Sequence, residues 1–383
     1  MREANSRRRD AGSDLTIERL EVFRLSLPMR KPLVMSTYRI DVGELLLVRI
    51  ETRGGTVGWG EAAAGPTMSG DTLDGMAAAI DRHLAPLLLG LPATDRSAVA
   101  RRLDHELFAN GGSKAAIDMA LLDATGRYFG VPAVELLGGA YRRSVAPLRL
   151  VGGAGATEVD VAEAIRARDL GHRAFKLKVG VAPVADEIAT MHRLREMLGD
   201  DALIAADANM GWDVPTARRF LDEAGPMRPA FLEQPLRPGD LVGMADVARG
   251  QPVPLGADEA IHGLADILAH VQAGAARGFS LKTIKLGGVS ALVRAAVVCD
   301  ALSLSVNVAM MMESSLATAA ILHAACAAPR IDWGVSLGNQ YLADDLVEVP
   351  IAMVDGMAAC PEGPGLGVTV DERKVRRLAA AGP

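Results

Sequence analysis

The chain has 383 residues, of which 50% are hydrophobic and 4% are aromatic, and its formal net charge is -6. This length allows one large α/β domain or two ordinary domains with a sizeable core. The mild negative charge gives no reason to expect nucleic acid or an anionic membrane as a partner. No apolar run reaches the roughly 18 residues of a transmembrane helix. The composition therefore predicts a soluble globular enzyme.

The cysteines and the start of the chain point to the same class of protein. Cys299, Cys326 and Cys360 are widely spaced and form no CxxC pair. This is typical of a reduced, cytoplasmic protein without a disulfide framework or a zinc site. Residues 1–13 contain four arginines and no apolar segment, so we interpret them as a disordered leader rather than a signal peptide. A nucleic-acid-binding arm is disfavoured because nothing later extends the basic patch.

An α+β domain is predicted over residues 14–140. Apolar and polar residues alternate in three segments that indicate an antiparallel meander, namely residues 16–27, 43–52 and 56–60. Residues 29–40, between the first two strands, contain Pro and Lys and are predicted to be a loop. This loop is long enough to reach away from the sheet and cover another part of the molecule. Amphipathic periodicity then predicts helices over residues 72–88, 95–108 and 113–129.

Beyond residue 140 the pattern changes to short apolar strands that alternate with helices. Eight strand candidates recur at roughly 25-residue intervals, over residues 145–151, 174–179, 203–209, 230–234, 254–259, 279–285, 305–311 and 332–337. A (β/α)8-type barrel explains this series more simply than a doubly wound sheet. We therefore expect an α/β fold with a TIM-like barrel domain over residues 141–348, and a segment 349–383 that returns to the first domain.

The second predicted strand carries two lysines, in the stretch Ala174-Phe175-Lys176-Leu177-Lys178-Val179-Gly180. Because a strand has a period of two, Lys176 and Lys178 project from the same face. An isolated pair of this kind is more often solvated on an edge strand. Burial beside a like charge would instead lower the pKa of Lys178 and let it act as a base.

Three consecutive predicted strands end in acids, which are Asp207, Glu233 and Asp258. Barrel enzymes work at the carboxyl ends of their strands, and neighbouring strands lie about 4.8 Å apart. Each acid alone could cap a helix. Together they predict an all-oxygen site for Mg2+ or Mn2+, since a hard divalent cation relieves the repulsion between carboxylates.

The sixth predicted strand adds Lys282, which faces the second strand across an eight-stranded ring. A substrate bound to the metal would lie between Lys178 and Lys282, and this geometry suits the transfer of a proton at carbon. Asn209 and Glu259 are expected to orient the ligands and lysines. Lys285 is predicted to turn to the other face of its strand and to be structural.

These residues, in this order, resemble the enolase superfamily and specifically its muconate-cycloisomerase-like subgroup, and the resemblance covers nearly the whole chain. In that family a Lys-x-Lys on strand two, metal acids on strands three to five and a lysine on strand six form the defining pattern. The resemblance implies a modified barrel that the first domain caps, with residues 29–40 closing over the substrate. Mandelate-racemase-like members use a late histidine instead, and none of the seven histidines is predicted at such a strand end.

The region of the eighth strand departs from that pattern. Muconate cycloisomerases carry an acidic residue after a Trp-Gly, whereas Trp333-Gly334 is followed here by Val335-Ser336-Leu337. The aspartates of dipeptide epimerases are also missing from this region. Ser336 and Glu313 are candidates for contact with the substrate, although Glu313 could equally cap the next helix.

The leading interpretation is an isomerase that depends on Mg2+ or Mn2+ and handles an enolate beside a carboxylate, with cycloisomerisation of a muconate-type diacid as its reaction. A racemase or epimerase of N-acylated or cyclic amino acids or dipeptides is an alternative, and a dehydratase of a hydroxy acid is another. A barrel that merely binds an acid is disfavoured by the complete lysine and metal set. We expect a small-molecule carboxylate as the partner and a homo-oligomer in the cytoplasm.

Overall fold

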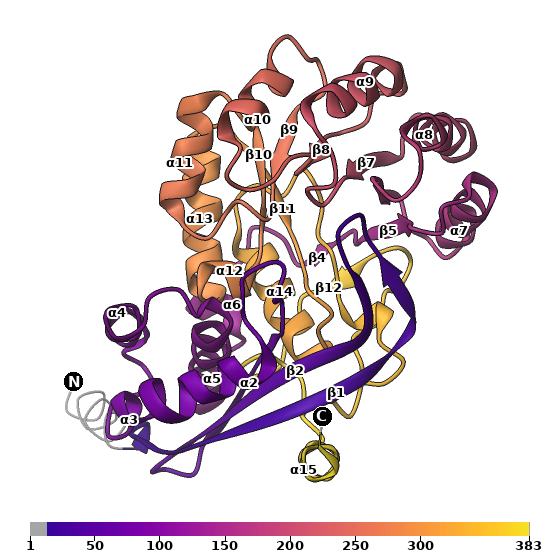
Figure 1. The fold of residues 1–383 in the computed structure, drawn as a ribbon. Coiled ribbons are helices and arrows are strands. Elements are labelled where there is room, and N and C mark those ends of the chain that lie inside the picture. Colours follow the sequence, from indigo (N-terminus) through magenta and orange to yellow (C-terminus); the bar gives the residue numbers. More distant parts are fainter. Residues whose placement is uncertain (1–13, 383) are drawn as a thin grey trace.

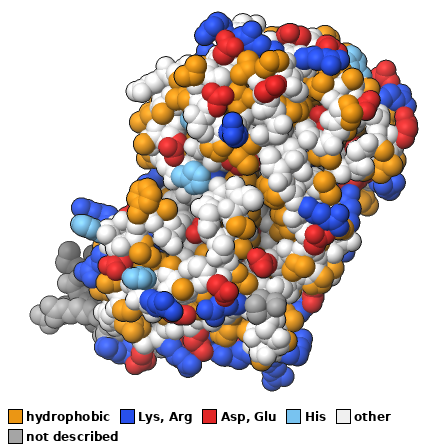
Figure 2. Space-filling view, viewed as in Figure 1, with side chains coloured by type: hydrophobic (Ala, Val, Ile, Leu, Met, Phe, Trp, Pro, Cys, Tyr) orange, Lys and Arg blue, Asp and Glu red, His pale blue; other side chains and the backbone are white. Residues whose placement is uncertain are grey.

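The computed structural model describes residues 14–382 and confirms the predicted class, a modified (β/α)8-type barrel with an N-terminal cap (Figure 1). Residues 1–13, interpreted above as a leader, lie outside the described part. No helix within residues 14–382 is long and apolar enough to cross a membrane. Acidic and basic side chains are interspersed over the face of the molecule that Figure 2 shows.

The cap is a three-stranded antiparallel sheet in the order β1-β2-β3, formed by β1 (Ile17–Val34), β2 (Arg39–Thr52) and β3 (Val57–Ala63). Its helical elements are α2 (Leu73–Ala79), η1 (Ile80–Leu84), α3 (Ala85–Leu88), α4 (Arg96–Glu106), α5 (Gly111–Phe129) and α6 (Ala133–Leu136). Helix α5 packs closely on β3 because two glycines leave it room. A Cβ at Gly58 would lie 2.2 Å from Ala120 O, and one at Gly60 would lie 1.9 Å from Ala116 O.

The prediction of a loop over residues 29–40 is wrong, because β1 and β2 form a long hairpin that remains paired as far as Val34 and Arg39. Only residues 35–38 form the turn at its tip. The register shifts between Pro28 and Leu33. Proline often indicates a loop, but an edge strand tolerates it at such an irregularity, where no ladder hydrogen bond from its nitrogen is needed. The hairpin reaches from the cap to the barrel (Figure 1).

The barrel strands are parallel and follow the chain in space, from β5 to β11. They are β5 (Leu148–Gly152), β6 (Ala174–Lys178), β7 (Leu203–Asp207), β8 (Leu232–Glu233), β9 (Leu255–Ala257), β10 (Gly278–Leu281) and β11 (Ser305–Val308). The helical elements between and after them are α7 (Thr157–Asp169), α8 (Val184–Leu198), α9 (Val214–Ala224), η2 (Gly225–Met227), α10 (Leu241–Ala248), α11 (Leu264–Ala273), α12 (Thr283–Leu286), α13 (Val289–Ala301), α14 (Ser315–Ala327) and η3 (Asn339–Tyr341).

The eighth predicted strand, residues 332–337, does not form a ladder. Val335 makes isolated parallel bridges to Pro147 and to Val308, and these close the ring between the first and last strands. The extended alternation fails because Gly334 has a φ of 88°. The ring of Trp333 stacks on Phe231 instead, with their centroids 4.1 Å apart.

Two further segments tie the C-terminal region to the rest of the molecule. The first predicted barrel strand is divided, because β4 (Ser144–Val145) pairs with β12 (Ala358–Ala359) rather than with the barrel. Helix α15 (Glu372–Ala381) lies against β1, where Arg376 Nη2 is 3.3 Å from Glu21 Oε2. The three cysteines are buried and free.

Candidate active site

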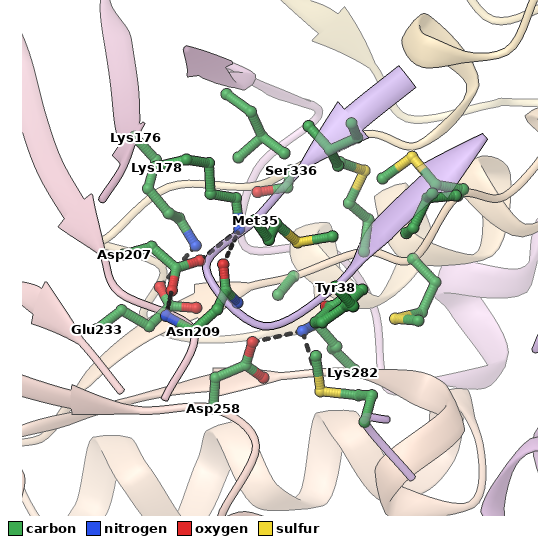
Figure 3. Close-up of a pocket in the computed structure, with 18 residues that line it drawn as sticks. Met35, Tyr38, Lys176, Lys178, Asp207, Asn209, Glu233, Asp258, Lys282 and Ser336 are labelled. Carbon is green, nitrogen blue, oxygen red and sulfur yellow. Dashed lines mark hydrogen bonds and ion pairs between the residues drawn. The ribbon is translucent and has the colours of Figure 1, made fainter. Parts of the chain in front are cut away.

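A cavity lies between the carboxyl ends of the barrel strands and the tip of the β1–β2 hairpin (Figure 3). Its polar lining is Lys176, Lys178, Asp207, Asn209, Glu233, Asp258, Lys282 and Ser336. The three acids lie at or directly after the carboxyl ends of their strands, as the sequence predicted. Asp207 and Glu233 are the last residues of β7 and β8, and Asp258 follows β9.

The lysines approach this cavity from two sides. Figure 3 shows Lys176 and Lys178 on the side of Asp207 and Glu233, with Lys282 beside Asp258. Lys178 Nζ lies 2.6 Å from Asp207 Oδ2, and Lys176 Nζ lies 2.6 Å from Glu233 Oε2. Lys282 Nζ contacts Asp258 Oδ2. The two lysines of β6 and the lysine that directly follows β10 therefore enter the cavity from different sides.

The three carboxylates have the chemistry of a divalent cation site. Each is at most 2% exposed, and Glu233 Oε1 is buried without a hydrogen-bond partner among the described residues. As they stand, no group of three acidic, histidine or cysteine side chains within residues 14–382 converges closely enough to hold an ion. A cation would therefore take carboxylate oxygens that now contact lysines. The unpartnered oxygen and the all-oxygen donor set fit that role.

Burial and ion pairing shift the pKa values of the acids and of Lys282 in different directions. Burial raises the pKa of Glu233 to about 7, with Lys176 opposing the rise and Asp207 adding to it. Burial would also raise the pKa of Asp258, but Lys282 and Lys285 bring it well below its usual range. Burial would lower the pKa of Lys282, yet Asp258 and Glu259 raise it above its ordinary value. Lys282 is thus held as an ammonium.

Asn209 and Glu259 surround the same groups. Asn209 Oδ1 accepts a hydrogen bond from Lys178 Nζ at 2.9 Å, and Asn209 Nδ2 donates to Glu259 Oε1 at 2.9 Å. Burial, followed by the charges of Asp258 and Asp207, raises the pKa of Glu259 to about 7. Glu259 does not line the cavity, so it acts on the site through Asn209.

Lys285 differs from its sequence interpretation. Strand β10 ends at Leu281 and Lys285 lies in helix α12, so the alternation of a strand does not apply to it. Its side chain is fully buried, and its Nζ lies 2.5 Å from Asp258 Oδ1. It also contacts the main-chain oxygen of Asp258. Lys285 therefore forms an ion pair with a candidate metal ligand, although it does not line the cavity.

The two candidate substrate contacts have different positions. Ser336 lines the cavity, and its buried Oγ has no partner among the described residues. Glu313 does not line it, and its Oε2 accepts a hydrogen bond from Met311 N at 3.0 Å. Burial raises the pKa of Glu313 to about 7.

Sequence reasoning missed the apolar wall of the cavity, which is formed by Leu33, Met35, Tyr38, Ile40, Met68, Leu150, Ala309, Met310, Met311 and Met312. Two signals were available. Three consecutive methionines follow β11, and Tyr38 lies in the segment predicted to cover the substrate. Burial raises the pKa of Tyr38 well above its usual range, so its phenol stays protonated.

Carboxylates on three consecutive strand ends, flanked by lysines from two opposed strands of a capped barrel, define an enzyme of the enolase superfamily. Comparison with known families agrees. A model described as "Enolase C-terminal domain-like" matches residues 160–374, and one described as "Mandelate racemase / muconate lactonizing enzyme, N-terminal domain" matches residues 19–138. The chain belongs to the mandelate racemase/muconate lactonizing enzyme family. Members of this family generally use a divalent metal ion.

Named relatives extend over almost the whole chain. Muconate cycloisomerase 1 of Pseudomonas putida is 34% identical, over 96% of this chain and 99% of its own. Chloromuconate cycloisomerase of Cupriavidus pinatubonensis is 35% identical, over 93% and 97%. The structure of muconate lactonizing enzyme from Pseudomonas fluorescens, complexed with muconolactone, matches with a TM-score of 0.91 at 31% identity, over 95% and 99%. N-succinyl Arg/Lys racemase from Bacillus cereus matches with a TM-score of 0.90 at 25% identity, over 95% and 98%.

Proposed function

We propose that this enzyme is a Mg2+- or Mn2+-dependent cycloisomerase that closes a muconate-type dicarboxylate to a lactone. The observation that carries the proposal is the placement of Lys178 and Lys282 on opposite sides of Asp207, Glu233 and Asp258. The names of the full-length relatives support the same substrate class.

The residues divide the chemistry between them. Asp207, Glu233 and Asp258 would hold the cation, which supplies positive charge where the carboxylate of the substrate becomes an enolate. One carboxylate oxygen forms a C–O bond with the conjugated diene, and the displaced π electrons reach the carbon beside the other carboxylate. An ammonium from Lys178 or Lys282 gives its proton to that carbon. The resulting neutral amine regains a proton from solvent, and the opposite lysine contributes charge.

The apolar wall favours ring closure. The attacking carboxylate loses its negative charge when it becomes the ester of a lactone. Apart from the three lysines, the described cavity lining contains no cation, and much of the remainder is methionine and leucine. A second carboxylate is poorly solvated against such a wall, whereas the uncharged lactone ring of the product, which keeps only one carboxylate, is not. The cavity therefore stabilises the product side of the reaction more than the dianion.

A racemase of N-acylated amino acids is the second candidate, because two lysines on opposite sides of one carbon could each exchange a proton with one enantiomer. The fold match to N-succinyl Arg/Lys racemase supports this second candidate.

Two assays distinguish these reactions. With cis,cis-muconate and Mg2+ or Mn2+, a cycloisomerase removes the ultraviolet absorbance of the diene and yields a lactone, and EDTA abolishes the reaction. With N-acyl amino acids in D2O, a racemase shows exchange of the α-proton by NMR. Exchange without any loss of diene absorbance would overturn the cycloisomerase proposal in favour of the racemase.

A further inference from the structure

The tip of the β1–β2 hairpin is fastened to the loop that follows β7. Ser36 Oγ lies 2.6 Å from the main-chain oxygen of Ala208 and 3.0 Å from that of Asn209. Thr37 Oγ1 donates to the same Asn209 oxygen at 3.2 Å. Two neighbouring hydroxyls of the cap therefore bond to the backbone of the loop that carries a site residue.

Ser36 sits in a socket made by two glycines. A Cβ at Gly211 would lie 2.5 Å from Ser36 Cβ, and a Cβ at Gly180 would lie 2.8 Å from it. Gly180 also has a φ of 82°, which disfavours any side chain there. The loops after β6 and β7 thus leave a space that Ser36 fills, and a single methyl group would close it.

Asn209 joins this socket to the chemical groups. Its main-chain oxygen accepts the hairpin hydroxyls, while its side-chain Oδ1 accepts from Lys178 Nζ at 2.9 Å. Its main-chain nitrogen donates to Asp207 Oδ1 at 3.0 Å. The residue has a φ of 39°, in the positive range that asparagine adopts more readily than most other residues.

We propose that Ser36 and Thr37 are positioning residues for Lys178. When the hairpin tip is seated, their hydroxyls hold the backbone of Asn209, and the Asn209 side chain then directs Lys178 Nζ into the cavity. Lys282 has no corresponding bond to Asn209. Closure of the cap is thereby coupled to the alignment of one lysine of the pair. The inference rests on the proposed proton-transfer role of Lys178.

The test uses variants that leave every residue of the cavity lining intact. Gly211→Ala introduces a methyl group into the socket, and its φ lies outside the left-handed range, so the backbone itself tolerates alanine. Ser36→Ala and Thr37→Val remove the hydroxyl bonds. Gly239→Ala is the matched control, because a Cβ there would meet nothing within 4 Å and its φ is also outside that range.

Four measurements are made on each full-length variant. Hydrogen exchange of residues 29–40 reports whether the hairpin is seated. Limited acetylation with mass spectrometry compares the labelling rates of Lys178 and Lys282. Titration with Mn2+ reports the metal site, and turnover of cis,cis-muconate reports the reaction.

We expect Gly211→Ala and the Ser36→Ala/Thr37→Val pair to speed hairpin exchange, and to raise the labelling of Lys178 more than that of Lys282. Turnover should fall on the order of 10-fold to 100-fold, as misplacement of a reacting group by about 1 Å does. Mn2+ affinity should fall less than turnover, because only one of the three proposed ligands, Asp207, bonds to Asn209. Gly239→Ala should behave as wild type.

Equal increases in labelling of the two lysines would overturn the proposal, because opening would then only admit reagent. Unchanged labelling with a loosened hairpin would also overturn it. If wild type does not turn over muconate, the proposed function fails, while exchange and labelling still decide the role of Ser36 and Thr37.

Discussion

Lys285 and Lys282 share one carboxylate: Lys285 Nζ lies 2.5 Å from Asp258 Oδ1, and Lys282 Nζ contacts Asp258 Oδ2. Lys282 lines the cavity and Lys285 does not. A substrate or cation that displaces Lys282 would leave Asp258 still held by Lys285. This arrangement lets one lysine move while the carboxylate stays in place.

Replacing Lys285 should therefore destabilise the protein. Lys285→Met leaves Asp258 with one ammonium instead of two, and we expect a loss of about 3 kcal/mol in the free energy of unfolding, measured with urea at neutral pH. Lys114→Met is the matched control, since Lys114 is also buried but its partner Asp104 is 71% exposed. That variant should lose about 1 kcal/mol or less. Equal losses would contradict a special role for Lys285.

The proposed metal ligands can be tested one at a time. Asp207→Asn, Glu233→Gln and Asp258→Asn should each weaken Mn2+ binding in a calorimetric titration and abolish turnover, because each removes a charged oxygen donor. Circular dichroism should show the barrel still folded. Asp201→Asn, at an exposed position, is the control and should bind Mn2+ as wild type does. Full activity after EDTA treatment and dialysis would contradict a metal requirement.

The two opposed lysines provide a test of the reaction class. Lys178→Ala and Lys282→Ala should each lose several orders of magnitude in turnover. If the enzyme is a racemase, each variant should still exchange the α-proton of one enantiomer with D2O, because the remaining lysine can remove the proton on its own side of the α-carbon. Proton NMR on both enantiomers measures this. Exchange by neither variant, with lactone formed by wild type, supports the cycloisomerase, whereas wild-type rates in both would remove the lysines from the mechanism.

The raised pKa of the buried Glu61 carboxyl leads to a prediction of how the free energy of unfolding depends on pH. Burial raises its pKa from 4.5 to about 8, against bonds from Ser314 and with Glu313 and Asp345 adding to the rise. The folded protein then keeps a proton that the unfolded chain releases, so the free energy of unfolding should fall as pH rises from about 5 to about 8 and level off above.

Urea unfolding across that range measures this slope. Glu61→Gln should reduce the slope, because the amide does not titrate, and the slope that remains comes from Glu233, Glu259 and Glu313, whose pKa values are also raised. Glu362→Gln, at an exposed position, should leave the slope unchanged. A slope that is the same in Glu61→Gln and in wild type would contradict the assignment to Glu61.

The barrel class and the order of the charged residues could be predicted from local patterns in the sequence. Lys176 and Lys178 share a face because a strand has a period of two. Asp207, Glu233 and Asp258 lie together because parallel strands end at the same edge of the ring. These are local rules applied to consecutive strands, so the spacing along the chain was sufficient to predict them.

Features that depend on contacts between distant parts of the chain could not be predicted in this way. Ser36 meets Asn209 across 173 positions of sequence, and no local pattern indicates that pairing. Lys285 reaches Asp258 because β10 stops at Leu281 and the chain turns into a helix, which strand periodicity did not anticipate. The prolines near residue 30 read as a loop until pairing with β2 is known. In each case the position of a side chain is set by an element elsewhere in the chain, whose place only the folded barrel and cap define.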